Sequence, residues 1–358
     1  MQSNQTQDKQ LTVAEIILKT LDEALDSDKS TLLFGLGVND PKGVFGTTTG
    51  LYQKYTTQRV FETPTSENAM TGVGVGLALA GYKPIMVHQR LDFFLLAMDQ
   101  LVNSAAKWHF MFGGESNVSI TIRLILGRGW GQGPTHSQNL HAWFAHIPGL
   151  KVVMPAFASD VKGLLNAAIR DPNPVVFIED RWIHGQLAEI SEIKDEIPLG
   201  VANLVTIGSD LTLVSSGYMS VLALKAVKYA KQNGIFIDLI DLRTIKPLDE
   251  NKILESVKKT GRLLVVDSGV EIGSFGSYVI SRVSSYGFNF LKVAPKLIAS
   301  LDIPEPTSHG VIEKFKISAV NIAESIFEIM DIAKPSDLIA ELRSPHHDVP
   351  DPFFTGPF

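Results

Sequence analysis

Cysteine is absent from this 358-residue chain, and so are long basic runs and long apolar runs. Without cysteine there is no disulfide framework, no thiolate metal site and no cysteine nucleophile. A net charge of −6 without a basic cluster argues against nucleic-acid binding. No apolar run approaches membrane-spanning length, and the polar start MQSNQTQDKQ lacks the apolar core of a signal peptide. We therefore expect a cytoplasmic protein that binds neither membranes nor nucleic acid.

What the sequence does contain is a repeated alternation of strand and helix patterns. Hydrophobic residues make up 45% and charged residues 20%, which is a globular composition of a length sufficient for two domains. The alternation predicts an α/β fold with a mostly parallel sheet, followed by a second α/β unit. We expect a flexible tail over 1–10, an α/β domain over 11–182, a linker over 183–203, a smaller α/β domain over 204–340 and a proline-rich tail over 341–358.

Local patterns predict the main elements. Thr12 and Glu15 form a capping-box pattern before an amphipathic helix that ends near Asp26. A long, mainly apolar helix is expected over 92–112. β-Branched and apolar runs predict strands over 31–34, 84–88, 118–126, 150–154, 174–179, 211–215, 236–240 and 263–266.

The stretch TPTSEN, residues 63–68, places one carboxylate at the start of a helix. A short strand over 59–61 leads into it. Ser66 can cap the helix, and Glu67 falls in the first turn, where the helix dipole favours a negative charge. By position alone, Glu67 is either an ordinary first-turn carboxylate or a buried functional group.

Three glycines follow in the same helix, at Gly72, Gly74 and Gly76, and Gly81 ends it. Each glycine costs about 1 kcal/mol relative to alanine inside a helix, so their density needs a reason. We expect the close approach of another backbone or helix.

His136 is a second candidate, because it follows the glycine-rich stretch 127–134 and precedes a helix. A histidine at such a junction can act as a general acid or base, or it can cap the helix or bond to the backbone. For His141 and His146 we expect core or interface positions. Arg90 either pairs with a substrate carboxylate or forms a surface ion pair.

Four segments resemble one enzyme family. They are TPTSEN with GVGVGLALAGYKPI, THSQ with HAWFAHIPGLKVVMPA, AIRDPNP and DLRTIKPLD. They are similar to segments of the beta subunits of thiamine-diphosphate-dependent 2-oxoacid dehydrogenases of the pyruvate and branched-chain types, and the resemblance covers residues 12–340. It implies a pyrimidine-binding transketolase-like domain followed by a transketolase C-terminal-like domain. The implied activity is oxidative decarboxylation of a 2-oxo acid with acyl transfer to a lipoyl group.

The resemblance also implies roles for single residues. Glu67 would contact the aminopyrimidine of thiamine diphosphate and assist its activation. Gln89 and Phe93 would lie beside the cofactor. His136 would reach the thiazolium end and the incoming lipoyl group. Arg90 departs from the acidic or apolar residues that are usual in the family at this place, so the resemblance does not identify the substrate.

The segment AIRDPNP is similar to the family's potassium loop. The matching positions are Ile120, Ala168, Asp171 and Asn173, mostly through backbone oxygens, and oxygen ligands suit a hard cation. The alternative is a plain helix end and turn. DLRTIKPLD is a family marker to which no chemistry is assigned.

No Gly-Asp-Gly segment is present, although enzymes of this kind use one to hold Mg²⁺ and the diphosphate. The resemblance therefore implies an alpha subunit that supplies this half of the site. We expect an α2β2 assembly, with the helix over 72–76 as a candidate contact, and a lipoyl-bearing acyltransferase as a further partner.

Two other functions stay open. A split transketolase-like two-carbon transferase would need phosphate-binding basic residues, for which Arg90 and Arg128 are the obvious candidates. A non-catalytic structural subunit is the second, and the presence of Glu67 and His136 argues against it. Trp130, bulky and within the glycine-rich stretch, would narrow the entrance to a site.

Overall fold

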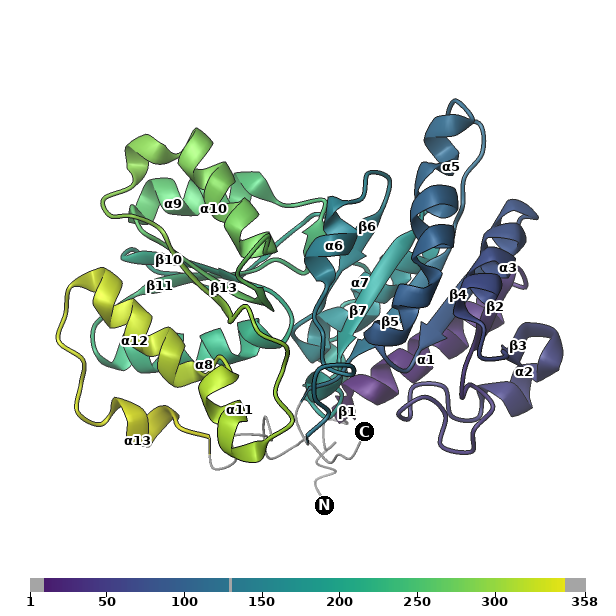
Figure 1. Ribbon diagram of the computed structural model, residues 1–358, viewed down its shortest axis with the longest axis horizontal. Helices are drawn as coiled ribbons and strands as arrows, with labels where there is room; N and C mark the ends of the chain where they lie inside the picture. The colour runs from purple at the N-terminus through teal and green to yellow at the C-terminus, as the bar shows by residue number, and fades with distance from the viewer. Residues whose placement is uncertain (1–9, 129–130, 345–358) are drawn as a thin grey trace, which may run out of the picture.

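Two large β-sheets stand side by side in the molecule, and helices cover both faces of each (Figure 1). The computed structural model describes residues 10–128 and 131–344. Trp130, which was expected to narrow the entrance to a site, therefore lies outside the described residues, and so do most of both predicted tails. The alternation of strands and helices confirms the predicted α/β fold class.

The first sheet has seven strands among the described residues, in the order β12-β6-β7-β5-β4-β2-β3. Its members are β2 (Thr31–Gly35), β3 (Val60–Glu62), β4 (Lys83–His88), β5 (Thr121–Leu126), β6 (Lys151–Val153), β7 (Val175–Asp180) and β12 (Thr244–Lys246). All neighbours run parallel except β12, which pairs antiparallel with β6. Parallel strands end at one edge, so the loops after β2, β3, β4 and β5 meet there. We call this the carboxyl edge.

The helices of this half follow the apolar periodicity of the sequence. They are α1 (Val13–Ser27), α2 (Leu51–Arg59), α3 (Glu67–Leu79), α4 (Leu91–Phe94), α5 (Ala106–Met111), α6 (His141–His146) and α7 (Ala158–Arg170). The predicted capping box opens α1, because the Glu15 amide donates to Thr12 Oγ1 at 3.2 Å and the Thr12 amide donates to Glu15 Oε2 at 2.8 Å. Gly81 has a φ of +90° just after α3, which confirms the predicted stop.

The expected helix over 92–112 is not one regular helix. It consists of α4, a 3-10 turn η1 (Leu95–Ala97), a π-helical segment η2 (Gln100–Ala105) and α5. Strand β5 also begins later than expected, at Thr121 instead of residue 118. Both differences concern local hydrogen-bond geometry, which apolar periodicity alone does not specify.

The second sheet has five strands in the described chain, ordered β14-β13-β10-β11-β9, and only β9 is antiparallel. The strands are β9 (Asn203–Thr206), β10 (Leu211–Ser215), β11 (Ile237–Asp241), β13 (Leu263–Val270) and β14 (Lys296–Ser300). The helices are α8 (Tyr218–Gln232), α9 (Glu250–Thr260), α10 (Phe275–Tyr286), α11 (His309–Phe315), α12 (Ala319–Met330) and α13 (Leu338–Leu342), with a 3-10 turn η5 (Phe288–Phe290). In Figure 1, α9 and α10 lie above this sheet and α8 and α12 below it.

Residues 183–203, expected to be a linker without regular structure, contain a short strand. β8 (Leu187–Glu189) pairs antiparallel with β1 (Gln10–Thr12), and the 3-10 turns η3 (Arg181–Ile183) and η4 (Ile190–Glu192) flank it. The chain start is thereby held against the segment that connects the two sheets.

The segment DLRTIKPLD, for which no role was predicted, joins the two halves. Its residues 244–246 form β12 and add an edge strand to the first sheet. Arg243 donates from Nε to Asp160 Oδ2 of α7 at 2.7 Å, and both side chains are buried. Lys246 Nζ donates to the carbonyls of Ala145 and Ile147 at the end of α6, at 3.0 and 2.8 Å. The motif therefore has a structural role in docking the second half.

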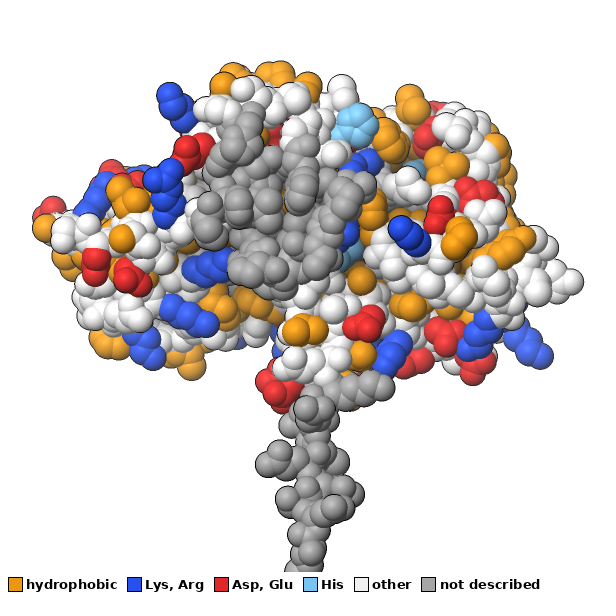
Figure 2. Space-filling view, turned by 90° about the horizontal axis from the view of Figure 1, so that it is seen from below, with side chains coloured by type: hydrophobic (Ala, Val, Ile, Leu, Met, Phe, Trp, Pro, Cys, Tyr) orange, Lys and Arg blue, Asp and Glu red, His pale blue; other side chains and the backbone are white. Residues whose placement is uncertain are grey.

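Two hydrophobic cores run through both halves. One combines α1 and α7 with α8 and α12, and the other combines α3 to α6 with α9 and α10. Because apolar side chains from both halves share each core, the two sheets pack as one body. Seen from below, the described surface carries acidic and basic side chains interspersed over both halves (Figure 2). In the part of the chain with described structure, no helix is long and apolar enough to cross a bilayer.

Candidate functional site

The side chain of Glu67 is largely buried at the carboxyl edge of the first sheet, only five residues after β3 ends. Glu67 is the first residue of α3 and is 8% exposed. Among the described residues no hydrogen bond or ion pair to its carboxylate is found. Buried carboxylates are normally paired, so this one is suited to hydrogen-bond a ligand that enters the site.

Ser66 occupies the position before the helix but does not cap it through its side chain. The prediction that it would is wrong. Its φ of −155° and ψ of 68° lie outside the extended conformation in which a serine hydroxyl reaches the first-turn amides.

The neighbouring carboxylate Glu62, which the sequence did not single out, has a structural role. As the last residue of β3, it accepts from the Gly37 amide at 2.7 Å and the Asn39 amide at 3.4 Å. It thereby fixes the loop that follows β2. Gln89 contributes to the same loop, because its Nε2 donates to the Leu36 carbonyl at 3.4 Å.

Phe93 and His136 come together, as expected for two residues of one site. Their ring centroids are 5.5 Å apart in an edge-to-face arrangement. His136 Nδ1 lies 3.0 Å from Thr135 Oγ1. Phe93 remains 36% exposed, so its ring is accessible from outside the chain.

Asp92 anchors the segment that carries His136. Its Oδ1 accepts from the Gln138 amide at 3.2 Å and from Gln138 Nε2 at 2.9 Å. Burial raises the pKa of Asp92, and the bonds from Gln138 oppose this rise. Asp92 Oδ2 is buried without a partner among the described residues, and so is the hydroxyl of Ser137. Both atoms are available to order a bound molecule or water at this place.

The two arginines weighed from the sequence have different surroundings. Arg90 is 6% exposed, so its side chain does not lie on the surface. Arg128 is also buried and forms an ion pair from Nε to Glu305 Oε2 at 2.8 Å. This pair ties the glycine-rich stretch to the second half, so Arg128 is not the free phosphate-binding group that a transferase would need.

The histidines after His136 differ from it in environment. His141 is 1% exposed, with Nε2 3.0 Å from Asp267 Oδ1 and Nδ1 2.8 Å from Asn139 Oδ1. Burial alone would raise the pKa of Asp267, but His141 and two backbone amides hold it below its ordinary value. His141 is therefore an internal contact between the halves, as predicted, whereas His146 is exposed.

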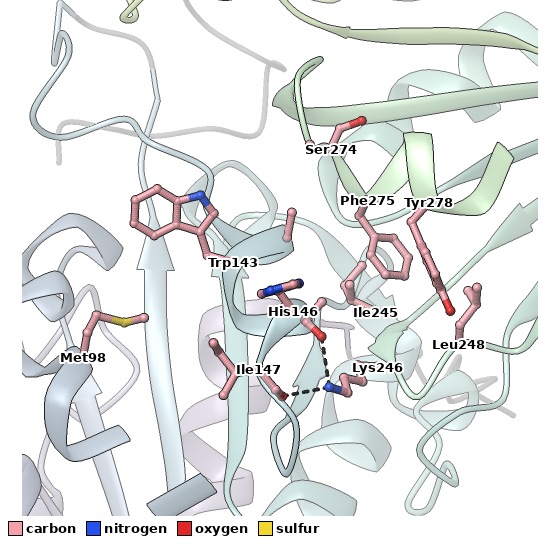
Figure 3. A pocket seen from close by; sticks show the side chains of 13 residues that line it. Met98, Trp143, His146, Ile147, Ile245, Lys246, Leu248, Ser274, Phe275 and Tyr278 are labelled. Carbon is pink, nitrogen blue, oxygen red and sulfur yellow. Dashed lines mark hydrogen bonds between the residues drawn. The ribbon is translucent and has the colours of Figure 1, made fainter. Parts of the chain in front are cut away.

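A cavity of about 670 Å³ lies elsewhere, between α6 and α10 (Figure 3). Trp143, His146, Lys246, Phe275 and Tyr278 are among its lining residues. None of the predicted site residues lines it. The cavity is therefore separate from the site at the carboxyl edge.

The predicted potassium positions lie together at the opposite edge of the sheet, where β5 and β7 begin. The Ile120 carbonyl accepts from the Val175 amide at 3.0 Å, and the Ala168 carbonyl from the Asp171 amide at 3.3 Å. The Asp171 carbonyl accepts from Ser119 Oγ at 2.7 Å. Each of these carbonyls keeps a second lone pair.

The two α/β halves have the order of the domains of a transketolase-like protein. Residues 9–183 match the family model "Transketolase, pyrimidine binding domain", and residues 200–322 match "Transketolase, C-terminal domain". A solved structure, "Split gene transketolase, inactive beta4 tetramer", shares the fold with a TM-score of 0.72 and 21% identity, over 90% of this chain and 99% of that one.

Sequence relatives narrow this class. The chain is 39% identical over 317 residues to "Pyruvate dehydrogenase E1 component subunit beta" of Rhizobium meliloti (strain 1021), which covers 88% of this chain and 68% of that protein. It is 38% identical over 302 residues to the mitochondrial subunit beta-1 of Arabidopsis thaliana (83% of each). It is also 38% identical over 297 residues to the Rickettsia bellii (strain RML369-C) subunit, over 83% of this chain and 91% of the relative.

The chain belongs to the family of pyruvate dehydrogenase E1 beta subunits. This confirms the family that the four motifs indicated, the thiamine-diphosphate-dependent 2-oxoacid dehydrogenase beta subunits.

Proposed function

We propose that this chain, together with an alpha subunit, catalyses the oxidative decarboxylation of a 2-oxo acid and transfers the acyl group to a lipoyl group of an acyltransferase. The observation that carries the proposal is Glu67, a buried carboxylate without a described partner at the carboxyl edge. The family of the chain supports it, since pyruvate is the substrate named for its relatives.

The residues at the carboxyl edge fit thiamine diphosphate. When bound, this cofactor supplies a thiazolium that accepts the electron pair released by decarboxylation. The Glu67 carboxyl would share a proton with a ring nitrogen of the aminopyrimidine. The exposed ring of Phe93 offers an apolar surface against the same ring, and the amide of Gln89 offers a hydrogen-bonding group beside it.

His136 would move a proton during acyl transfer. Thr135 Oγ1 contacts Nδ1, so Nε2 would be the nitrogen that meets the substrate. The edge of the Phe93 ring against the imidazole holds its orientation. In this role His136 Nε2 would protonate the leaving sulfur of the lipoyl disulfide, as the other sulfur takes the acyl group and the S–S bond breaks.

The other half of the site would come from the alpha subunit in an α2β2 assembly, with Mg²⁺ held mainly by that partner. Exposed apolar side chains near α3 and α5 support a partner surface, since Leu96, Phe110 and Phe112 are 68%, 89% and 50% exposed. A Cβ added at Gly76 of α3 would have no atom within 4 Å, so this face of the helix is open to close approach by a partner. K⁺ would bind through the oxygens of Ile120, Ala168, Asp171 and Asn173.

Substitution of the key carboxylate tests this function. Glu67→Gln removes the acid without changing its shape, and we expect kcat to fall by about 100- to 10,000-fold or more. The measurement is thiamine-diphosphate-dependent turnover of 2-oxo acids by the assembled complex, with a melting curve to check the fold. Glu62→Gln is the matched control, because among the described residues this neighbour accepts hydrogen bonds from two backbone amides, those of Gly37 and Asn39. Full activity of Glu67→Gln would contradict the proposal.

A further inference from the structure

The loop after β5 carries His136, and the short segment after β4 holds this loop on both sides of the histidine. Before it, Arg90 Nη2 donates to Gln132 Oε1 at 3.1 Å. After it, Asp92 Oδ1 accepts from the Gln138 amide at 3.2 Å and from Gln138 Nε2 at 2.9 Å. The position of His136 therefore depends on contacts between two neighbouring loops of the carboxyl edge.

The contact between Asp92 and Gln138 holds the backbone as well as a side chain. Asp92 lies in the first turn of α4 and is 7% exposed. Its Oδ2 has no partner among the described residues, so the hydrogen bonds described from this carboxylate to other residues all go to Gln138. Hydrogen bonds to a charged group that is shielded from water are stronger than those between neutral groups. This contact is therefore suited to fix the backbone two residues after His136.

The imidazole of His136 is held from the same segment. Phe93, which follows Asp92 directly, presents its ring at 5.5 Å in an edge-to-face arrangement. Burial raises the pKa of Asp92, and the bonds from Gln138 and the charge of His136 oppose this rise. The carboxylate thus interacts electrostatically with His136 and is joined by hydrogen bonds to the backbone of its loop.

We propose that Asp92 is a positioning residue for acyl transfer, which holds His136 in place through Gln138 and is not needed for decarboxylation. This inference rests on the proposed function, in which Glu67 serves the activation of the cofactor and His136 serves the transfer. None of the hydrogen bonds described for Asp92 goes to α3, which carries Glu67. Loss of the carboxylate should therefore displace His136 and leave Glu67 where it is.

The two steps can be measured separately on the complex of this chain with its alpha subunit. Decarboxylation is followed with dichlorophenolindophenol, an artificial electron acceptor that requires no lipoyl group. Acyl transfer is followed by mass spectrometry of a lipoylated domain of the acyltransferase. The substrate is pyruvate or 3-methyl-2-oxobutanoate, whichever the wild type turns over faster.

We expect Asp92→Ala to lower kcat of acyl transfer by about 10- to 100-fold and turnover with the artificial acceptor by less than about 3-fold, because a small displacement of a reacting group is costly only in the step that uses it. KM for the lipoylated domain should change little. His136→Ala is the reference for a selective defect in acyl transfer. A melting curve of each complex checks its assembly.

Two further variants separate positioning from folding. Asp92→Asn keeps an oxygen that can accept both bonds from Gln138, so acyl transfer should stay within about 3-fold of the wild type. Gln138→Glu sets a second carboxylate against Asp92 and should reproduce the selective loss. Combining the two places an amide donor opposite the new carboxylate, and acyl transfer should recover by about 5-fold or more relative to Gln138→Glu alone.

Glu62→Ala is the matched control. Glu62 is also a carboxylate at the carboxyl edge, and it also holds a loop through backbone amides, those of Gly37 and Asn39. That loop does not carry His136. The ratio of the acyl-transfer rate to the decarboxylation rate should therefore be the same in Glu62→Ala as in the wild type.

Three results would overturn the inference. One is a ratio of the two rates that Asp92→Ala leaves unchanged, whether both fall or neither does. Another is a loss in Asp92→Asn as large as that in Asp92→Ala, which would make the charge the cause. The third is a combined variant no better than Gln138→Glu, and this comparison decides if Asp92→Ala does not assemble. Failure of the proposed function looks different, because the wild-type complex would then not acylate the lipoylated domain, or His136→Ala would acylate it at the wild-type rate.

Discussion

The buried ion pair between Arg123 of β5 and Glu179 of β7 provides a quantitative test of how the first sheet is held together. The side chains are 0% and 1% exposed, and Arg123 Nη2 donates to Glu179 Oε2 at 2.9 Å and to Thr47 Oγ1 at 3.0 Å. Burial alone would raise the pKa of Glu179, but the charge of Arg123 and a contact with His184 lower it to about 2. Relative to the ordinary value of 4.5, this corresponds to about 3 kcal/mol.

Arg123→Met should therefore lower the free energy of unfolding at pH 7 by about 3 to 5 kcal/mol, since it leaves a buried carboxylate beside His184 alone. Because the pKa is lower in the folded state, the contribution is complete above pH 4.5 and is lost as the pH falls toward 2. The difference in the free energy of unfolding between the wild type and Arg123→Met should therefore shrink as the pH falls through that range. Urea denaturation followed by circular dichroism at several pH values measures it.

Two controls make this test specific. The pair of Arg170 and Glu196 is 61% and 73% exposed, so Arg170→Met should cost less than about 1 kcal/mol. Combining Arg123→Met with Glu179→Leu should recover part of the loss, because no buried charge remains unpaired. A cost for Arg123→Met no larger than that for Arg170→Met, or a deficit that does not change with pH, would refute the reasoning.

Two further predictions follow from the packing of α3 and from the potassium positions. Gly74→Ala should lower the free energy of unfolding by about 1 to 3 kcal/mol, because its Cβ would meet Ile120 Cδ1 at 2.8 Å and Phe34 Cζ at 3.1 Å, whereas Gly76→Ala should raise it by up to about 1 kcal/mol. Denaturation of the isolated chain measures the free energy of unfolding of both variants. Equal effects of Gly74→Ala and Gly76→Ala would contradict the close packing described at Gly74. If K⁺ binds, the melting temperature should be higher in KCl than in NaCl. At a K⁺ concentration ten times the dissociation constant, the gain in the free energy of unfolding is about 1.4 kcal/mol. Identical melts would contradict a selective cation at Ile120, Ala168, Asp171 and Asn173.

The parts of the fold that the sequence predicted well are those determined by local interactions. The capping box at Thr12 and Glu15, the strand over 211–215 and the stop at Gly81 depend on neighbouring residues or on glycine itself. The helix over 92–112 was predicted in place but not in form, because its π-helical segment η2 reflects packing against α3.

The missed elements depend on distant partners. β12 is three residues long and becomes a strand only by pairing with β6, which lies about 90 residues earlier in the chain. β1 and β8 are equally short and pair across about twice that separation, as in the pair of Leu11 with Ala188. No local periodicity marks strands of this length, because their hydrogen bonds are supplied by a remote segment.

In the candidate site, too, local motifs mark some residues, whereas contacts between distant residues have no mark in the sequence. Motifs pointed to Glu67, Gln89, Phe93 and His136, which stay predictions, and the structure brings the rings of Phe93 and His136 into contact. The pairing of Arg128 with Glu305, 177 positions apart, has no signal in the sequence. Glu62 was overlooked because a carboxylate at a strand end is common, and only its two backbone contacts reveal its role.

The central claim is that this chain holds half of a thiamine-diphosphate site and needs a partner for the rest. Calorimetric titration of thiamine diphosphate with Mg²⁺, first on this chain alone and then on its mixture with an alpha-type chain, tests it most directly. We predict binding only in the mixture, and Glu67→Gln should weaken it. Tight binding to this chain alone, or no binding in the mixture, would contradict the claim.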